Sequence, residues 1–525
     1  VGSNGSGKTT LCKTINGLVP HFFQGEFEGS ATVAGIDMLE AGVAGLAPHV
    51  GYVSQDFDNQ LVRATVKDEA RFAPLNFGLV DWRDKGDQAL EAAGIAHLAE
   101  EMVWQLSGGQ RHLVAIAAAL SLGAEILIID EPVAQLDPRA AAATYERLAA
   151  LNRSGRTIIV IEHHTELIAQ HCSSVALVVA GAVRWHLPTR TALGRVDELS
   201  EQSIHPPSVA RVAVKLGIQP PVPITVDDAA HRLSGWLAHG SPPPRRQPDH
   251  GDVVAHWDAV EYAYRLVEGG KAAVLNGVDL SVRSGERVAL IGGNGSGKST
   301  LLRLMSGHLR PGAGRVNVGG LDAGEHRPDE LADVVMLVPQ RPEEVFLLDS
   351  IRADALMHPV ARHRHDADHV VDHALRRLGL ESLAERDGRL LSGGQQRRAA
   401  LAIALAARPR ILLLDEPTAS LDVASREEIV EAVDVASDNV EAVVIATHDM
   451  ELVARWASRV VVLHRGTIVD DGPPGDVFER TWAEEAGVIP PTAVVLSRRL
   501  GLEPTALTPD ELVARLRRAD IEAVS

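Results

Sequence analysis

The fold is decided by two glycine-rich stretches, Gly2-Ser3-Asn4-Gly5-Ser6-Gly7-Lys8-Thr9-Thr10 and Gly292-Gly293-Asn294-Gly295-Ser296-Gly297-Lys298-Ser299-Thr300. Each fits the pattern G-x-x-x-x-G-K-[ST]. The glycines let backbone N–H groups turn toward phosphates, and the helix that follows adds the positive end of its dipole. The lysine then reaches the β- and γ-phosphates, and the hydroxyl of Thr9 or Ser299 ligates Mg²⁺. Two such loops in comparable contexts predict two bound nucleotides.

A longer repeat surrounds the two loops. Ser107-Gly108-Gly109-Gln110 recurs 285 residues later as Ser392-Gly393-Gly394-Gln395. The same offset relates Gln55 to Gln340, Asp130-Glu131 to Asp415-Glu416, and His163 to His448. The phosphate loops themselves lie 290 residues apart, so the first copy carries extra residues, which we place within positions 20–28. A period of this size indicates two homologous domains and not a solenoid.

The order of these motifs resembles that of ABC-type ATPase domains, and the likeness covers nearly the whole chain. The resemblance implies an α/β fold of two tandem P-loop NTPase domains, which hydrolyse ATP with Mg²⁺. In that family two domains pair head to tail, and each ATP lies between the phosphate loop of one domain and the LSGGQ stretch of the other. Carried onto this chain, Lys8 and Thr9 pair with Ser392 to Gln395, and Lys298 and Ser299 pair with Ser107 to Gln110.

The resemblance also implies roles for the other repeated residues, and phosphoryl transfer depends mostly on such positioning and charge neutralisation. The implied Mg²⁺ ligands are Asp130 and Asp415, together with Thr9, Ser299, Gln55 and Gln340. The glutamates that polarise the attacking water are Glu131 and Glu416. The γ-phosphate sensors are His163 and His448. Neither half lacks a catalytic residue. We therefore expect two competent sites.

The nucleobase side is less symmetric. Tyr264 precedes the second phosphate loop where the family places an aromatic that stacks on adenine, and the alternative is an aromatic strand residue that packs in the core. The first copy has no counterpart, because Val1 lies inside the strand that feeds its phosphate loop. We expect a segment of about forty residues, similar to that before Gly292, to precede Val1.

Composition limits the remaining classes. The net charge of −19 argues against a protein that binds nucleic acid by neutralising its phosphates. The two cysteines, Cys12 and Cys172, are too few for a disulfide framework and suit a reducing cytosol. No apolar stretch is long enough to span a membrane, since residues 113–129 are interrupted by polar residues. We expect that the chain itself does not cross a membrane.

A second, smaller repeat follows each ATPase domain. Pro206-Pro207-Ser208 begins a stretch that includes Thr225 and Arg232-Leu233, and Pro490-Pro491-Thr492 begins a similar stretch with Thr508 and Arg515-Leu516. Thr225 and Thr508 are expected helix N-caps. The expected domains are ATPase domain 1 at 1–190, its helical extension at 191–236, a proline-rich linker at 237–252, ATPase domain 2 at 253–475, and its extension at 476–525.

These extensions resemble the C-terminal tails of the ATPases of energy-coupling-factor transporters, which import cobalt and vitamins. The stretch Gln55 to Asn76 is similar to a segment of that group, except that Phe57 stands where proline is usual, and the second half keeps only Gln340 to Phe346. The resemblance implies a transmembrane coupling subunit and a substrate-capture membrane protein as partners, at the cytoplasmic face of the membrane. It also implies that the two halves dock unlike surfaces of the partner.

Two other interpretations stay open. A tandem ABC ATPase that acts on ribosomes or nucleic acid would use the same motifs, but it usually carries a long charged linker and basic patches; an exporter ATPase is a further alternative. Residues 363–373 hold four histidines and three aspartates. They could bind metal, but a solvated helix face is the favoured interpretation, because arginines interleave with them.

Overall fold

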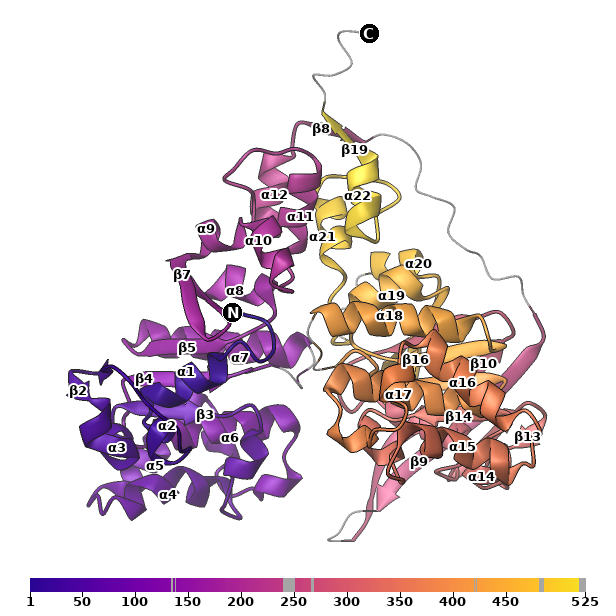
Figure 1. Ribbon diagram of the computed structural model, residues 1–525, viewed down its shortest axis with the longest axis horizontal. Helices are drawn as coiled ribbons and strands as arrows, with labels where there is room; N and C mark the ends of the chain where they lie inside the picture. Colours follow the sequence, from indigo (N-terminus) through magenta and orange to yellow (C-terminus); the bar gives the residue numbers. More distant parts are fainter. Residues whose placement is uncertain are drawn as a thin grey trace. The chain divides into compact units, whose positions relative to one another are not determined.

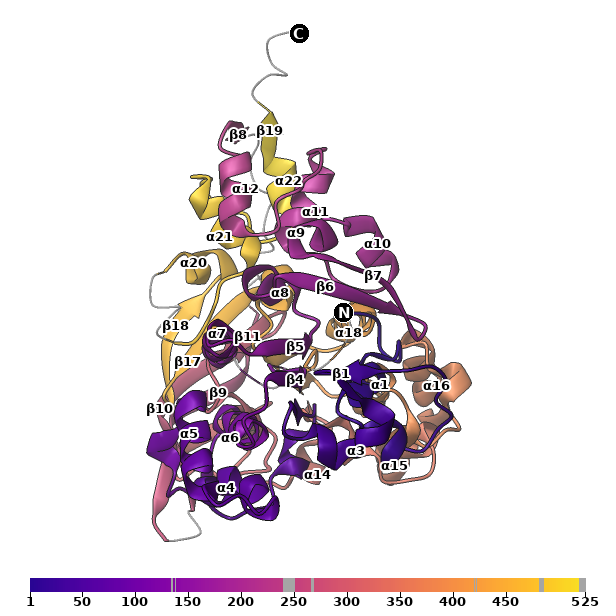
Figure 2. The same cartoon turned by 90° about the vertical axis from the view of Figure 1, so that its left-hand side faces the viewer.

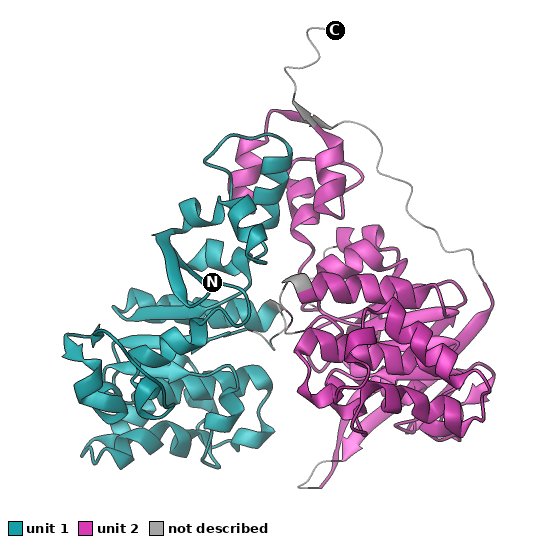
Figure 3. Ribbon diagram, viewed as in Figure 1, with its two compact units in different colours: residues 1–225 teal, residues 226–525 magenta. Residues whose placement is uncertain are grey.

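The computed structural model describes residues 1–133, 136, 138–238, 251–265, 269–419, 421, 423–480 and 486–518. The chain forms two compact units, Val1–Thr225 and Val226–Ser525 (Figure 3). Both contain parallel strands that alternate with helices, so the predicted α/β class of both halves is confirmed. Among the described helices, none combines the length and apolar character that a membrane span requires.

The first unit is built on a parallel sheet of β3 (Val50–Val53), β4 (Ile126–Asp130) and β5 (Thr157–Ile161), which lie side by side in that order (Figure 1). Figure 2 shows β4 beside β5 from another side. All but a few of their side chains are apolar, as expected of strands covered on both faces. A hairpin of β6 (Ser174–Val179) and β7 (Ala182–Pro188) adds an antiparallel pair, and Val1 accepts a backbone bond from Val178 of 2.9 Å.

The helices of the first unit supply the rest of its core. They are α1 (Lys8–Ile15), α2 (Leu18–His21), α3 (Met38–Leu46), α4 (Val66–Asn76), α5 (Trp82–Ala93), α6 (Gly108–Leu120), α7 (Pro138–Arg153), α8 (Thr165–His171), α9 (Thr189–Leu193), α10 (Val196–Glu201) and α11 (Ser208–Lys215), with short 3₁₀ turns η1 (Phe57–Gln60), η2 (Ala96–Leu98) and η3 (Val103–Gln105) and the strand pair β1 (Thr32–Val33) and β2 (Ile36–Asp37). One cluster joins α4, α5 and α6 to β3 and β4 through Val66, Leu90, Ile116 and Leu127. These three helices therefore form a helical subdomain beside the sheet.

The second unit contains a larger sheet in the order β14-β15-β16-β11-β17-β18. Its strands are β14 (Val335–Val338), β15 (Ile411–Asp415), β16 (Ala442–Ala446), β11 (Arg287–Ile291), β17 (Arg459–His464) and β18 (Thr467–Gly472), all parallel except the last. An antiparallel sheet holds β9 (Val253–Arg265), β10 (Lys271–Arg283), β12 (Ala313–Val318) and β13 (Leu321–Asp322). The strand β11 feeds the second phosphate loop from the middle of the large sheet.

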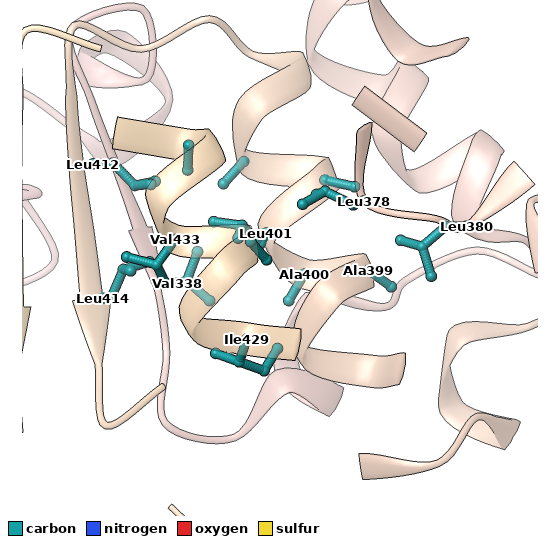
Figure 4. Close-up of a cluster of buried hydrophobic side chains, with 14 of the residues drawn as sticks. Val338, Leu378, Leu380, Ala399, Ala400, Leu401, Leu412, Leu414, Ile429 and Val433 are labelled. Carbon is teal, nitrogen blue, oxygen red and sulfur yellow. The ribbon is translucent and has the colours of Figure 1, made fainter. Parts of the chain in front are cut away.

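The helices of the second unit are α12 (Val226–Arg232), α13 (Lys298–Met305), α14 (Pro328–Leu331), α15 (Ile351–Ala361), α16 (Ala367–Arg377), α17 (Gly393–Ala406), α18 (Val423–Ser437), α19 (Met450–Trp456), α20 (Pro474–Glu479), α21 (Thr492–Arg499) and α22 (Pro509–Arg515), with 3₁₀ turns η4 (Pro342–Val345), η5 (Glu381–Leu383) and η6 (Gly388–Leu390). Figure 4 shows how Leu401 of α17 packs with Val433 of α18 against Leu412 and Leu414 of β15. This core fixes the helix that begins at the second LSGGQ stretch against the strand that ends at Asp415.

Part of the first extension belongs to the second unit. Helix α12 packs on α21, and Asp227 lies 3.3 Å from the guanidinium of Arg499. Strand β8 (Trp236–Ala238) pairs antiparallel with β19 (Leu516–Arg518). Thr508 accepts the N–H of Glu511, as an N-cap does. The linker expected at 237–252 lies outside the described residues over 239–250, and its first two residues belong to β8.

Candidate active site

The two phosphate loops have matching geometry. Gly7 and Gly297 stand directly before α1 and α13 with φ of 100° and 110°, a region that glycine adopts without strain. Lys8 donates from Nζ to the carbonyls of Gly2 and Ser3 at 2.8 and 2.9 Å. Lys298 does the same to Gly292 and Gly293 at 2.7 and 3.2 Å. Each lysine is thus folded back over its loop, with its charge at the N-terminus of the helix.

The hydroxyl of each phosphate loop meets the aspartate at the end of a buried strand. Thr9 Oγ1 donates to Asp130 Oδ2 at 2.7 Å, and Ser299 Oγ donates to Asp415 Oδ1 at 3.0 Å. Burial raises the pKa of both aspartates above the ordinary value. A hydroxyl and a carboxylate oxygen at this distance are the hard oxygen donors that Mg²⁺ prefers, so the residues present fit that ion.

The glutamate that follows each aspartate has an unusual backbone. Glu131 and Glu416 have φ of 53° and 48°, which costs energy for a residue with a Cβ. Their N–H groups donate to Ile161 and Ala446 of the neighbouring strand at 3.0 and 2.8 Å, which holds the turn in place. Strain of this kind occurs at sites where a side chain must point in a fixed direction.

Each glutamate contacts the predicted sensor histidine. His163 Nε2 lies 3.2 Å from Glu131 Oε1, and His448 Nδ1 lies 2.9 Å from Glu416 Oε2. Burial by itself would lower the pKa of His448, but the hydrogen bond and charge of Glu416 outweigh it and raise that pKa. Glutamate and histidine therefore form a pair in both halves.

The two predicted glutamine ligands are not equivalent. Gln55 donates from Nε2 to Glu131 Oε2 at 2.8 Å, which brings it into the first site. Gln340 is exposed after β14, and no hydrogen bond joins it to any residue in the described part of the chain. The structure therefore brings one of the two glutamines to the glutamate that is predicted to polarise water.

The LSGGQ stretches each open a helix with the same capping box. Ser107 Oγ accepts the N–H of Gln110 at 3.3 Å, and Gln110 Oε1 accepts the N–H of Ser107 at 3.0 Å. Ser392 and Gln395 make the reciprocal bonds in the second half at 3.5 and 3.2 Å. Because Gly108 and Gly393 lie in the first turn of α6 and α17, the N-terminal N–H groups there stay free of bulky side chains, a geometry suited to an anionic ligand.

Tyr264 lies near the end of β9 and is 37% exposed, so it is not a fully packed core residue. Its hydroxyl is 3.3 Å from Thr300 Oγ1 on α13, and its ring meets that of Tyr262 edge to face at 5.0 Å. This places one exposed aromatic face beside the helix of the second phosphate loop.

Sequence reasoning missed the residues that fix the histidine loops. Glu162 and Tyr145 are both 2% exposed, and the Tyr145 hydroxyl donates to Glu162 Oε2 at 2.9 Å. In the second half Asp449 accepts from Thr418 Oγ1 at 2.9 Å and from Arg426 Nε at 2.8 Å. The signal in the sequence is an acid directly beside each sensor histidine.

Two other sequence features find places outside the site. The aspartates of residues 363–373 pair with arginines: Asp368 and Asp372 with Arg352, and Asp366 with Arg408. No group of three or more histidine, cysteine or acidic side chains in the described ranges is arranged to hold a metal ion. Cys12 is buried on α1, where burial raises its pKa to about 11.

Comparison with known proteins decides the family. A model described as "ABC transporter" matches residues 1–134 and 275–419, which together are more than half of the chain. This chain belongs to the ABC transporter family. It carries two ATPase domains of that family in one polypeptide, so the predicted ATP-binding and ATP-hydrolysing activity is confirmed.

The relatives are of similar length. A protein of Caldanaerobacter subterraneus subsp. tengcongensis, provisionally named an ABC transporter ATP-binding protein, is 31% identical over 99% of this chain and 93% of its own length. A protein of Streptomyces coelicolor with the same provisional name is 35% identical over 91% of this chain and 88% of its own. Among solved structures, cbiO1 from Clostridium perfringens, part of the ABC transporter complex cbiONQ, is 31% identical with a TM-score of 0.40, and the match covers 44% of this chain and 92% of cbiO1.

Proposed function

We propose that this chain is the motor of an ABC importer of energy-coupling-factor type, which couples ATP hydrolysis to uptake of a vitamin or metal ion through separate membrane subunits. The observation that carries the proposal is the pair of complete catalytic sets in one chain, each followed by its own helical extension. The motor requires both sets, because each composite site takes its phosphate loop from one half and its LSGGQ helix from the other.

The residues of each half divide the work of hydrolysis. The lysine and the N-terminus of its helix bind the phosphates, and the LSGGQ helix of the other half supplies further N–H donors. Glu131 and Glu416 accept hydrogen bonds from the attacking water and orient it toward the γ-phosphate, while His163 and His448 hold those carboxylates. The loop hydroxyl and the strand aspartate would hold Mg²⁺, which when bound would supply positive charge against the phosphate oxygens.

An exposed apolar surface beside the glutamine loop supports a membrane partner. In the first half Val62 is 60% exposed although its N–H, with that of Arg63, is fixed by the buried carboxylate of Glu69. In the second half Leu347 is 65% exposed, and Asp354 fixes the N–H groups of Leu347 and Leu348. An apolar side chain held outward by a buried acid is suited to dock onto another protein.

The proposal is tested by purification in detergent. We expect the chain to co-purify with a small transmembrane protein, and Val62→Glu or Leu347→Glu to lower that recovery several-fold without change in ATP turnover by the isolated chain. Val183→Glu is the matched control, because Val183 is also exposed but belongs to β7 and to neither of these loops. Recovery with ribosomes in place of a membrane protein would instead favour the tandem ATPase that acts on nucleic acid.

The import assignment needs a separate measurement. Cells that depend on the chain should lose uptake of one vitamin or metal ion when Glu131 and Glu416 are both changed to glutamine. Unchanged uptake of every candidate, combined with loss of export of a compound, would contradict an importer and favour an exporter.

A further inference from the structure

Two positions next to the catalytic loops differ between the halves in a compensating way. Phe57 in the first half stands where the second half has Pro342, and His112 stands where the second half has Arg397. These positions lie on two elements that pack together in each half, η1 with α6 and η4 with α17. In each half a larger residue at one position is combined with a smaller residue at the other, as a packed interior of fixed volume requires.

In the first half the pair is an aromatic stack. The rings of Phe57 and His112 lie 4.8 Å apart at an interplanar angle of 27°, and the side chains are 9% and 2% exposed. Next to them Arg111 Nε lies 3.2 Å from Asp58 Oδ1, a second link between α6 and η1. The glutamine loop and the LSGGQ helix are therefore held to each other by both packing and charge.

His112 also reaches the catalytic loop. Its imidazole is hydrogen-bonded to the backbone of Pro132, and it must donate to the carbonyl, because proline has no N–H. Pro132 directly follows Glu131, whose carboxylate accepts from Gln55. These contacts form a closed circuit. Gln55 bonds to Glu131, the next residue Pro132 bonds to His112, and His112 stacks on Phe57, which lies two residues after Gln55 in the chain.

In the second half the same helix position binds the catalytic loop more firmly. Arg397 donates from Nη1 to the carbonyls of Glu416 and Pro417 at 2.9 and 3.3 Å, and from Nη2 to that of Ala419 at 2.5 Å. A guanidinium with several donors replaces one imidazole N–H. Here the loop after the catalytic glutamate is fixed by α17, and Gln340 is not bonded to Glu416.

We propose that Phe57 and His112 are a positioning pair that ties the Glu131 loop to the Gln55 loop, so that movement of the glutamine loop displaces the catalytic glutamate of the first half but not that of the second. The inference rests on the proposed roles of Glu131 and Glu416. The two halves are then unequal, although their proposed catalytic residues match. The position of Glu131 depends on the loop that carries Gln55, whereas the position of Glu416 is fixed by Arg397.

Exchange of the pairs tests this inference on the full-length chain. His112→Arg and Phe57→Pro should each lower the turnover that depends on Glu131 about tenfold, with the KM for ATP within twofold, because the catalytic carboxylate is displaced while the phosphate loop is untouched. The double change Phe57→Pro with His112→Arg should recover most of that loss, since Pro342 and Arg397 fit the same backbone. Two single losses that simply add in the double variant would overturn the pairing.

The part of the turnover that depends on Glu131 is isolated with glutamate variants. In the Glu416→Gln chain, the loss of turnover caused by His112→Arg or Phe57→Pro should be fully visible. If the Glu416→Gln chain is inactive because the two halves work only together, the same loss is measured in the chain that keeps Glu416. In the Glu131→Gln chain the same substitutions should cause no further loss. An equal loss in that chain would overturn the inference, because His112 would then act on something other than Glu131.

Two controls separate this idea from instability and from failure of the proposed function. Ile116→Val shortens a buried side chain of α6 that packs in the core of the helical subdomain, and it should cost stability but leave turnover unchanged. A loss with Ile116→Val equal to that with His112→Arg would show a structural role alone. If Glu131→Gln itself left turnover intact, the roles of the glutamates would be wrong, whereas a full effect of Glu131→Gln with none from His112→Arg would refute only the pair.

Discussion

The loops that carry His163 and His448 are both fixed by an internal carboxylate, but it comes from opposite sides of the histidine. In the first half Glu162, directly before His163, accepts the N–H groups of His163 and His164 at 2.8 and 3.0 Å and the hydroxyl of Tyr145. In the second half Asp449, directly after His448, accepts from Thr418 and Arg426 and caps α19 through the N–H of Leu452. The acid therefore stands before the histidine in the first half and after it in the second, and its hydrogen-bond partners differ between the halves.

The difference teaches that the geometry of the site is kept while its support is rebuilt. Thr418 and Arg426 correspond to Val133 and Ala141, which cannot donate from their side chains, and Tyr145 corresponds to Val430. The first half thus uses only neutral donors, and the second uses a guanidinium. Because a buried charge that loses its partner is costly, the two supports should respond differently to the same loss.

The largest effect comes from the groups that the two halves share. Glu131→Gln and Glu416→Gln should each lower ATP turnover, and the double change should lower it about a thousandfold, equal to about 4 kcal/mol of barrier, because the group that orients water is lost in both sites. Steady-state release of phosphate measures this. Hydrolysis untouched by Glu131→Gln would show that the halves are not equally competent.

The supports of the histidine loops give the next effect. Asp449→Asn should destabilise the second unit by about 3 kcal/mol, because Arg426 loses the buried carboxylate of Asp449, although Glu451 still lies 3.8 Å from it. Glu162→Gln should cost only about 1 kcal/mol, because one oxygen still accepts and the partners are neutral. Urea unfolding of the two variants compares them directly. Equal shifts of the unfolding midpoint would mean that the charge of Arg426 is not what separates the two loops.

The stability of the first unit should depend on pH through His112. Burial lowers the pKa of its imidazole from 6.5 to about 4, against the opposing effect of the hydrogen bond that the imidazole donates to the carbonyl of Pro132. As the pH falls from 6.5 to 4, the unfolded chain takes up a proton that folded His112 does not, so this contribution to stability is complete above pH 6.5 and is lost over that window. The loss should be about 3 kcal/mol.

Thermal unfolding of wild type and His112→Gln at several pH values isolates this contribution. The glutamine variant does not titrate, so its stability should fall less than that of wild type between pH 6.5 and 4. Arg397, the matching residue, stays charged over this range, and no such difference is expected from Arg397→Gln. Parallel pH curves for wild type and His112→Gln would show that the imidazole is not buried in its neutral form.

Much of this architecture could be predicted from the sequence, because the motifs couple chemistry to spacing. Apolar runs that end in Asp130 and Asp415 predict buried parallel strands, and the glycines before Lys8 and Lys298 predict a tight loop before a helix. Both features depend on neighbours in sequence alone. For that reason the α/β class could be inferred without the structure, whereas the meeting of loop hydroxyl and strand aspartate was expected only from the resemblance to ABC-type ATPases.

The supports could not be predicted in this way, because they depend on contacts between distant segments. Nothing local in the sequence shows that Phe57 stacks on His112, that Arg397 spans three carbonyls, or that Glu162 accepts a hydrogen bond from Tyr145 of α7. The pairing of β8 with β19 joins segments that are far apart in the chain. Ala238 pairs with Leu516, which lies 278 residues later (516 − 238). Such long-range choices depend on the packed three-dimensional neighbours.

The smallest effect concerns the nucleobase, where Tyr264 offers an exposed aromatic face beside α13. Tyr264→Ala should weaken ATP binding by about 1 kcal/mol, close to a fivefold rise in the dissociation constant, because the stacking surface is lost. Tyr264→Phe should bind almost normally, since the ring stays and only the hydroxyl contact with Thr300 is removed. Titration with a fluorescent ATP analogue measures both variants. Weakening by Tyr264→Phe as large as by Tyr264→Ala would mean that Tyr264 acts by its hydroxyl on the helix of the phosphate loop, and that the adenine of the second site is held by another residue.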